Sequence, residues 1–303
     1  MTKPLRFGVA GIGYWADTVH IPGLKQQPAV ELVGAWGRNP KVLTEVTARH
    51  GIRAFARFED MLSEVDAVSI SLPPGVQAEL AVVAADAGKH LLLEKPIAPT
   101  VEAAARVAEA IERNRVANVV FFTRRFVPGF ERALQEASRQ GWAGARVRQL
   151  TGALLPGSPY ISSVWRAAEN GALWDLAPHT FSVLNAILGP VEQIAASRSS
   201  DRVSRFTAIH RGGARSEAEL SLHTPESGLA SEYRFHAPGR EHALPLPTFP
   251  RPQALAAAAG ELAANIACGE RAHRCDVRLG LEVVRALAAA DRSIAAGGTP
   301  VAV

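Results

Sequence analysis

The chain is poor in cysteine and has no long apolar run. Only Cys268 and Cys275 occur among 303 residues, too few for a disulfide framework and without the neighbouring ligands of a metal site. We therefore expect a reduced, cytoplasmic protein without a bound metal. The opening MTKPLRFGVAGIG breaks into glycines too early for a signal peptide. No apolar stretch reaches the roughly 20 residues of a membrane span, so no membrane partner is expected.

Basic clusters are also missing. The net charge is +4, yet no long run of basic residues occurs, so nucleic acid is not an expected partner. Lysine is scarce, because the 33 cationic side chains include lysine only at positions 3, 25, 41, 89 and 95. With 48% hydrophobic and 20% charged residues, the composition is that of an ordinary globular protein. Its length exceeds what one compact core usually holds, which predicts two domains.

Short apolar runs alternate with helical stretches in the first 122 residues. This alternation is typical of βαβ units, whose parallel sheet is covered on both faces. We therefore predict an α/β fold here: a doubly wound parallel sheet that forms a dinucleotide-binding Rossmann domain over residues 1–122. The expected strands lie at 5–10, 30–36, 66–72, 90–94 and 118–122, with helices at 76–88 and 100–114.

From residue 123 the pattern changes to helices followed by half-buried strands. In 216–223, apolar and polar residues alternate with period two, and 205–210 precedes this run across a hairpin-like RGGAR turn. We predict that residues 123–303 form a C-terminal α+β domain for substrate binding and oligomerisation, with a largely antiparallel open sheet. Helices are expected at 126–141 and 170–189, and two more, rich in alanine, close the chain.

A glycine-rich loop follows the first expected strand. Gly11-Ile12-Gly13-Tyr14-Trp15-Ala16 fits the GxGxxA form of the dinucleotide fingerprint. Gly11 would permit the tight turn, Gly13 would let the backbone approach a pyrophosphate, and Ala16 would allow close helix packing. The helix that begins here would point its amino terminus at the phosphates. Because glycines also end strands as ordinary turn residues, the motif gains its weight from its position in a βαβ series.

The end of the second strand bears on the choice of cofactor. NAD-selective folds place Asp or Glu there for the adenosine ribose, whereas this chain reads Ala35-Trp36-Gly37-Arg38-Asn39. Arg38, preceded by a glycine that leaves room, could pair with a 2′-phosphate through two parallel hydrogen bonds. We therefore predict NADP(H) in preference to NAD(H), with Trp36 and Arg38 beside it. The alternative is that Arg38 is a solvated loop residue of an arginine-rich protein.

An acid and a base stand where the fourth strand ends. HLLL at 90–93 reads as a strand buried on both faces, and Glu94-Lys95-Pro96 follows it. Ligands of open α/β sheets bind beyond the carboxyl ends of the strands, so this segment is expected at the cofactor, as are Leu72 and Pro73 after the third strand. The ammonium of Lys95 could stabilise a developing alkoxide. The alternative is a lysine that merely extends from a strand end into solvent.

Asp175 and His179 form a second pair of ionisable residues. Their i, i+4 spacing places both on one face of a helix, although Pro178 between them predicts that the helix begins there or bends. Hydride transfer from an alcohol requires a group that takes the hydroxyl proton, and histidine is suited to this near neutral pH. The alternative is a structural histidine.

Several stretches resemble the Gfo/Idh/MocA oxidoreductase family, which includes glucose–fructose oxidoreductase and inositol dehydrogenase. The resemblance spans nearly the whole chain, and its most specific parts are the EKP segment and the D-x-x-x-H helix. The matching stretches include AGIGYWADTVHIPGL, SLPPGVQAELAVVAADAGKHLLLEKPIA, RRFVPGF, GWAGARV, Trp165-Arg166, NGALWDLAPHTFSVLNAILG and DVRLGLEVVRALAAADRSIAAGG.

The resemblance implies roles for these residues. It implies that Lys95 lies beside the nicotinamide and hydrogen-bonds the reacting oxygen, and that the Lys95–Pro96 peptide is cis. It implies that His179 is the general acid/base and that Asp175 binds a neighbouring hydroxyl or orients the imidazole. It also implies a small-molecule substrate that is a sugar, an inositol or a related polyol or ketone. A homodimer or homotetramer built on the open sheet is expected as well.

Other side chains are expected near the substrate or the first helix. Arg124, Tyr160 and Trp165 are predicted to contact the substrate. Arg125 is expected either to do the same or to link the two domains. His20 matches a family position and is expected to pack against or cap the first helix.

The chain departs from the family pattern at several positions. Ala177 replaces the usual glycine, Ser182 replaces a second aspartate, and Pro74 and Gln77 stand where asparagine and histidine are common. Ser182 is given no role. The resulting prediction is an NADP(H)-dependent oxidoreductase that acts on CH–OH groups. The alternatives are a catalytically silent dinucleotide-binding regulator and an NAD-dependent lyase or glycosidase-type enzyme of the same family.

Overall fold

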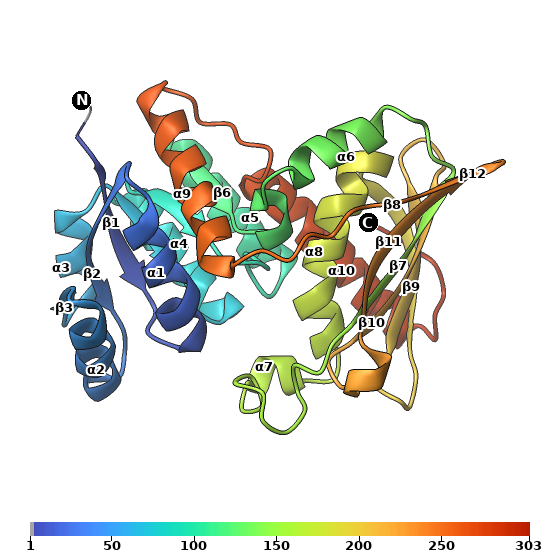
Figure 1. Ribbon diagram of the computed structural model, residues 1–303, viewed down its shortest axis with the longest axis horizontal. Helices are drawn as coiled ribbons and strands as arrows, with labels where there is room; N and C mark the ends of the chain where they lie inside the picture. Colours follow the sequence, from blue (N-terminus) through green and yellow to red (C-terminus); the bar gives the residue numbers. More distant parts are fainter. Residues whose placement is uncertain (1–2) are drawn as a thin grey trace. The chain divides into compact units, whose positions relative to one another are not determined.

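The computed structural model describes residues 3–303, and contacts along the chain divide it into two compact units (Figure 1). The first contains the residues up to Pro128 together with Phe249–Leu281, and the second contains Gly129–Thr248 and Glu282–Val303. The predicted division, with a single boundary after residue 122, does not include this return of the chain to the first unit. The returning segment, Phe249–Leu281, comes after the antiparallel strands of the second unit in the sequence.

The first unit is built on a six-stranded parallel sheet. Its order, β3-β2-β1-β4-β5-β6, is that of the dinucleotide-binding Rossmann fold, as predicted. The sequence prediction missed β3, whose three residues carry too short a pattern to recognise. The strands are β1 (Leu5–Ala10), β2 (Val30–Trp36), β3 (Arg53–Phe55), β4 (Ala67–Ile70), β5 (His90–Leu93) and β6 (Asn118–Val120).

Helices cover this sheet because its central strands are apolar on both faces. All residues of β4 are buried, as are Leu91, Leu92 and Leu93 of β5. Helix α4 packs against α5, and α9 from the returning segment packs against α1. The helical elements of this unit are η1 (Ala16–His20), α1 (Ile21–Gln26), α2 (Pro40–His50), α3 (Phe58–Glu64), α4 (Pro74–Asp86), α5 (Val101–Arg113), η2 (Thr123–Phe126) and α9 (Arg251–Ala267).

The second unit contains a seven-stranded sheet in the order β12-β11-β7-β10-β9-β8-β13. Only β7 and β10 pair in parallel, and every other neighbouring pair is antiparallel, as expected for this part of the chain. The strands are β7 (Gly144–Leu150), β8 (Val191–Arg198), β9 (Ser204–His210), β10 (Arg215–Ser221), β11 (Ala230–Ala237), β12 (Arg240–Ala243) and β13 (Val301–Ala302).

Helix α8 (Gly171–Leu188) lies along one face of this sheet and contacts β7, β9 and β10 (Figure 1). It begins at Gly171, so Pro178 lies inside the helix and does not start it. The helix predicted at 126–141 begins later in the structure, as α6 (Phe130–Ser138). It cannot include Gly129, because this residue adopts a φ of 77°. The remaining helices are α7 (Val164–Ala167), η3 (Glu226–Gly228) and α10 (Val277–Ala295).

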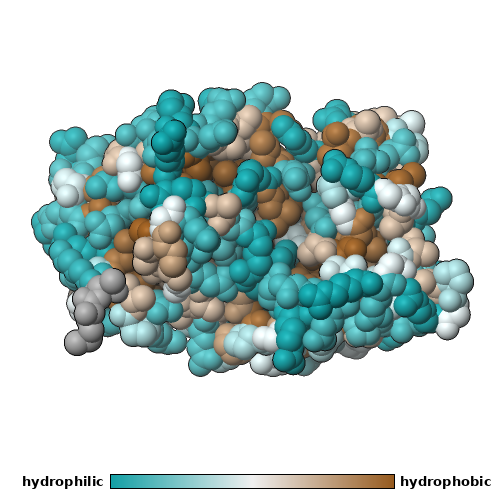
Figure 2. All heavy atoms as spheres, turned by 90° about the horizontal axis from the view of Figure 1, so that it is seen from above, coloured by the Kyte–Doolittle hydropathy of each residue, from teal (hydrophilic) through white to brown (hydrophobic). Residues whose placement is uncertain are grey.

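Hydrophilic side chains cover most of the face seen in Figure 2, and apolar ones form scattered patches. Few large apolar side chains of residues 3–303 are exposed; they are Tyr14, Val83, Ile161, Val164, Leu229 and Val303. Among the described helices, none is both long and apolar enough to cross a bilayer.

Candidate active site

The glycine-rich loop has the backbone that a dinucleotide requires. Gly11 adopts a φ of 123°, and a Cβ added there would lie 2.3 Å from the carbonyl oxygen of Ser71, so a side chain is excluded. A Cβ on Gly13 would meet no atom within 4 Å, which leaves open space next to the backbone where a pyrophosphate could approach. Ala16 is fully buried, in agreement with its predicted packing role. The loop residues therefore fit a bound dinucleotide.

The end of β2 packs against this loop. A Cβ on Gly37 would lie 2.4 Å from Cγ1 of Ile12, so Gly37 makes room for the loop itself as well as preceding Arg38. The ring of Trp36 packs against Phe58 with centroids 5.4 Å apart. Arg38 is exposed and forms no ion pair with another residue of the described chain. Its predicted contact with a 2′-phosphate stays a prediction.

Glu94 accepts hydrogen bonds from residues far away in the sequence. Its Oε1 accepts a hydrogen bond from the indole Nε1 of Trp15 at 2.7 Å and lies 3.0 Å from Nε2 of His20. Its Oε2 accepts from the backbone N–H of Lys95 at 3.1 Å. The other ring nitrogen of His20, Nδ1, lies 2.7 Å from the hydroxyl of Ser69. One carboxylate thus joins the helix after the glycine-rich loop to the segment that carries Lys95.

Of the two roles expected for His20, the structure shows packing and not capping. It makes no capping hydrogen bond, and it is fully buried between Ser69 on β4 and Glu94 after β5. It does pack, edge to face, against Phe121 at 6.0 Å. Sequence analysis missed the contact with Glu94 because the two residues are 74 positions apart.

The Glu94–Pro96 segment is held from the other side by Gln77. Its side-chain amide makes three hydrogen bonds to the backbone of Glu94 and Pro96. The Lys95–Pro96 peptide is cis, as the resemblance implied. Leu72 and Pro73 lie in the turn between β4 and α4, next to Ser71, whose carbonyl contacts Gly11. The predicted cofactor residues of the first unit therefore converge on the carboxyl edge of its sheet.

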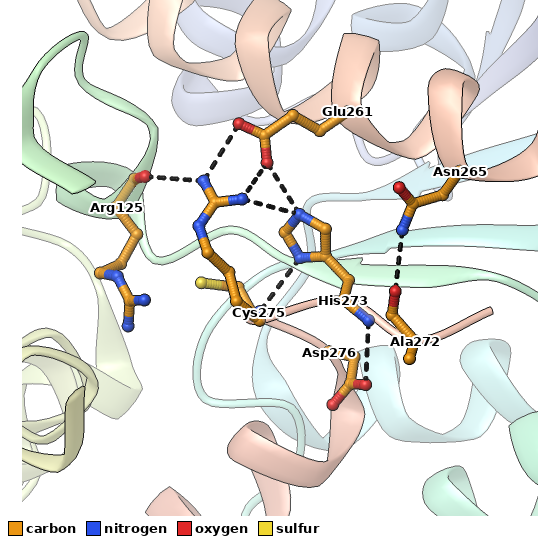
Figure 3. A network of polar contacts seen from close by, with 8 residues as sticks. Arg125, Glu261, Asn265, Ala272, His273, Cys275 and Asp276 are labelled. Carbon is orange, nitrogen blue, oxygen red and sulfur yellow. Dashed lines mark hydrogen bonds and ion pairs between the residues drawn. The ribbon is translucent and has the colours of Figure 1, made fainter. Parts of the chain in front are cut away.

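The short helix η2, which carries Arg124 and Arg125, is fixed by the polar network of Figure 3. Nη2 of Arg274 donates to the backbone oxygen of Arg125 at 3.1 Å, and the same guanidinium is bonded to Glu261. The His273 ring lies 2.7 Å from Glu261. Burial tends to raise the pKa of Glu261, but hydrogen bonds from His273 and Arg274 lower it below its ordinary value.

This network holds η2 in place but does not show which ligand η2 contacts. Arg125 is buried, whereas Arg124 is partly exposed. The predicted substrate contact of Arg124 and the alternative roles of Arg125 therefore stay predictions.

Asp175 and His179 lie one turn apart on α8, as their spacing predicted. Asp175 is 7% exposed, and its Oδ2 accepts a hydrogen bond from Nε of Arg166 at 3.0 Å. The Ser182 hydroxyl donates to the backbone oxygen of His179 at 2.8 Å, inside the same helix. Ser182 therefore makes a helix contact that a carboxylate, as an acceptor, could not make.

Arg166 was not among the predicted site residues, yet it contacts three groups around Asp175. Its guanidinium lies over the rings of Trp165, at 4.3 Å, and Tyr160, at 4.6 Å, and Nη1 donates to the hydroxyl of Ser163 at 3.3 Å. Tyr160 and Trp165, predicted to contact substrate, thus both make cation–π contacts with Arg166. Their direct contact with a substrate stays a prediction.

The start of α8 is tied to α10 by Asp291. Its two carboxylate oxygens accept from Nδ2 of Asn170 and Nε1 of Trp174, each at 2.7 Å. Burial raises the pKa of Asp291 above its ordinary value, although both hydrogen bonds oppose this. The residues that precede Asp175 at the start of α8 are therefore anchored.

The predicted catalytic residues come from both units. Lys95 belongs to the first unit, and Asp175 and His179 belong to the second. Their meeting at one substrate stays a prediction. Within residues 3–303, no group of three or more His, Cys, Asp or Glu side chains is arranged to hold a metal ion.

Comparison with known proteins finds a family model that matches the first part of the chain. Residues 5–122 match the GFO_IDH_MocA model, described as "Oxidoreductase family, NAD-binding Rossmann fold". An uncharacterized oxidoreductase of Synechocystis sp. is 32% identical over 208 residues, which are 66% of this chain and 56% of that protein. Levoglucosan dehydrogenase of Pseudarthrobacter phenanthrenivorans is 29% identical over 54% of this chain and 44% of its own. The chain thus spans about half the length of such relatives.

Solved structures show the same fold over the whole chain. GenD2 from gentamicin A biosynthesis, in complex with NAD, has a TM-score of 0.86 at 21% identity and covers 100% of this chain and 97% of its own. Scyllo-inositol dehydrogenase from Lactobacillus casei, with NAD(H) and scyllo-inositol, has a TM-score of 0.85 at 18% identity, and the match covers 99% of each chain. The resemblance found in the sequence is confirmed for residues 5–122, the part of the chain that matches the Gfo/Idh/MocA family model.

Proposed function

We propose that the protein is an NADP(H)-dependent oxidoreductase that transfers hydride between the nicotinamide and a sugar, an inositol or a related polyol or ketone. The observation that carries this proposal is the placement of Lys95. It follows β5 at the carboxyl edge of the sheet, in a segment that hydrogen-bonds the helix of the glycine-rich loop through Trp15 and Glu94. A cation fixed next to a dinucleotide loop suits chemistry at the cofactor.

The dinucleotide, when bound, accepts a hydride from the substrate carbon or returns one to it. In the oxidation of an alcohol, His179 takes the hydroxyl proton as the C–H bond gives up its hydride, and in the reverse reaction it returns the proton to the oxygen. The ammonium of Lys95 donates a hydrogen bond to that oxygen and stabilises the charge that develops on it. Asp175, a buried acceptor beside Arg166, binds a neighbouring hydroxyl of the substrate.

The substrate class is supported by the named relatives. The relatives include levoglucosan dehydrogenase and, at 28% identity, D-xylose 1-dehydrogenase (NADP(+)) 2 of Haloferax volcanii. Two fixed hydrogen-bonding groups one helical turn apart, Asp175 and His179, suit a substrate with adjacent hydroxyls.

The preference for NADP(H) rests on β2. No acid stands in Ala35–Asn39, and Arg38 is exposed at the strand end where a ribose substituent would be read. NAD accompanies two of the similar structures, so this preference is a proposal about the present chain alone. A cytoplasmic location and assembly into a homodimer or homotetramer are likewise proposed.

The test is turnover by the purified full-length chain. A panel of aldoses, inositols and polyols is supplied with NADP+ and, separately, NAD+, and absorbance at the reduced nicotinamide band is followed. Lys95→Met and His179→Asn should each lower kcat by about 100-fold or more, because each removes a group that acts on the reacting oxygen. Tight dinucleotide binding without turnover of any substrate would favour the alternative, a catalytically silent regulator.

A further inference from the structure

We propose that Gln77 is a positioning residue that fixes the backbone on both sides of Lys95 and so determines where its ammonium lies. The inference rests on the proposed role of Lys95 at the cofactor. Gln77 lies in the first turn of α4 and is 1% exposed. Its side chain is an uncharged amide.

The side-chain amide of Gln77 makes three hydrogen bonds to one short segment. Its Oε1 accepts from the backbone N–H of Glu94 at 2.8 Å. Its Nε2 donates to the backbone oxygen of Glu94 at 2.8 Å and to that of Pro96 at 3.1 Å. These bonds bracket Lys95, because one carbonyl precedes it and the other follows it.

The location of these bonds explains why a side chain is needed. The pairing of β5 with β4 and β6 ends at Leu93, so the next backbone groups no longer have a strand partner. Largely buried backbone groups without partners are costly, and the amide of Gln77 replaces the missing ladder. Gln77 therefore holds the Glu94–Pro96 segment in place beyond the point where strand pairing ends.

The peptide group between Glu94 and Lys95 is held at both of its polar atoms. Gln77 binds its carbonyl oxygen, and the carboxylate of Glu94 accepts from its N–H at 3.1 Å. That carboxylate is held in turn by Trp15 and His20. With the peptide plane fixed, only the side-chain torsions of Lys95 remain to be set by its surroundings.

The choice of an amide has a chemical consequence. Glutamine supplies two N–H donors and an acceptor at every pH, whereas a neutral histidine supplies one of each, and a protonated one supplies two donors and no acceptor. Histidine could therefore accept from the N–H of Glu94 only when neutral. The three hydrogen bonds that Gln77 makes on either side of Lys95 are therefore independent of pH over the range in which histidine titrates.

The experiment compares three variants of the full-length protein. Gln77→Leu removes all three hydrogen bonds at similar volume, and Gln77→His restores a part of them. Asn118→Leu is the matched control, because Asn118 is also a buried amide whose side chain bonds backbone, with Oδ1 accepting from Val277 N–H at 2.7 Å, but it stands at the amino end of β6. Unfolding midpoints, NADPH affinity by tryptophan quenching and steady-state kinetics are measured for each.

Gln77→Leu should lower kcat by about 100-fold, since a small misplacement of a catalytic group has that effect, while NADPH affinity stays close to wild type. Asn118→Leu should lower the unfolding midpoint to a similar degree but leave kcat near wild type. Gln77→His should recover part of kcat at pH 8 and lose it more steeply than wild type as the pH falls through about 6.5. Equal kcat in Gln77→Leu and Asn118→Leu would overturn the proposal.

A second readout needs no substrate. The chain has few lysines, so reductive methylation followed by peptide mass spectrometry reports Lys95 separately, with Lys25 and Lys41 as internal references. Saturating NADPH should slow methylation of Lys95 in the wild type and in Asn118→Leu, and this protection should be lost in Gln77→Leu. Unchanged protection in Gln77→Leu overturns the proposal even if no substrate is ever found. Absence of protection in the wild type overturns the placement of Lys95 itself.

Discussion

The Nε of Arg166 donates to Oδ2 of Asp175 at 3.0 Å, and both side chains are largely buried. The guanidinium also lies over the rings of Tyr160 and Trp165, and these two aromatic contacts help to hold it beside the carboxylate. The pair orients Asp175 as an acceptor on the same helix face as His179. Arg166 thus acts on the proposed chemistry through Asp175.

Replacing Arg166 should therefore affect turnover more than cofactor binding. Arg166→Met removes a charge-assisted hydrogen bond worth about 1.5–3 kcal/mol, and we expect kcat/KM to fall by about 10–100-fold with NADPH affinity unchanged. Arg166→Lys keeps the charge but loses the planar guanidinium, so its kcat/KM should lie between those of the wild type and Arg166→Met. Arg198→Met is the control, since Arg198 pairs with the exposed Glu169 in the same unit. Similar losses in the Arg166 and Arg198 variants would contradict this role.

The predicted preference for NADP(H) over NAD(H) depends on Arg38. Arg38→Ala should weaken NADPH binding by about 10–100-fold, the loss of one charge-assisted contact, and leave NADH binding unchanged. Quenching of Trp15 and Trp36 provides the measurement. Arg57→Ala serves as the control, because Arg57 is an exposed arginine of the same unit. Equal effects on NADPH and NADH, or tighter binding of NADH by the wild type, would show that Arg38 is an ordinary surface residue.

The sequence was sufficient for features that repeat or that depend on neighbouring residues. Strand and helix alternation predicted the Rossmann sheet, and the glycines of the loop have the conformation and space that their motif requires. The i, i+4 spacing placed Asp175 and His179 on one helix face. Each of these signals is local, so its meaning does not depend on the tertiary structure.

The missed features all depend on contacts between distant residues. Trp15 and His20 reach Glu94 across 79 and 74 positions, and no periodic pattern records such a pairing. Gln77 could be noticed only as a departure from the family, and its role became visible with the three bonds to the Glu94–Pro96 segment. Arg166 lay in a matched motif, but its partner is nine residues away on another helix.

A buried histidine in the second unit predicts how stability depends on pH. His210 is fully buried, with Nδ1 2.7 Å from the Gly189 oxygen and Nε2 2.7 Å from the Ser216 hydroxyl. Burial lowers its pKa, although the bond to Gly189 opposes this. Between the lowered folded pKa and the unfolded value of about 6.5, the unfolded chain binds the extra proton, so stability falls as the pH drops through this range.

The measurement is the thermal unfolding midpoint between pH 5 and 8. We expect the midpoint of the wild type to decrease below about pH 6.5. His210→Asn should be less stable at pH 8, where it loses one hydrogen bond, but its midpoint should decrease less on acidification. A matched variant is His242→Asn, because His242 is a partly exposed histidine of the same unit. Parallel pH curves for wild type and His210→Asn would contradict the prediction.

The exposed face of the seven-stranded sheet bears on assembly. Val147 and Phe206 are buried on the α8 side, and the opposite face carries ion pairs in which Arg148 lies 3.4 Å from Glu219 and 3.6 Å from Glu232. Such a face tolerates water, so it does not require a cover as an apolar face would. Its mixed charges are nevertheless complementary to those of a second copy of the chain, so we expect association through it to be electrostatic and sensitive to salt.

Light scattering at low and high salt tests this expectation. The wild type should be a homodimer or homotetramer at about 0.05 M NaCl and should shift toward monomer at about 1 M, where exposed charges are screened within a few ångströms. Glu219→Arg should weaken association at low salt, because it places like charges next to Arg148 and Arg205. Glu136→Arg, on the exposed side of α6, is the matched charge reversal away from the sheet. If neither salt nor Glu219→Arg changes the assembly, the subunits associate through another surface. If the protein is a monomer at every salt concentration, the proposed oligomer is wrong.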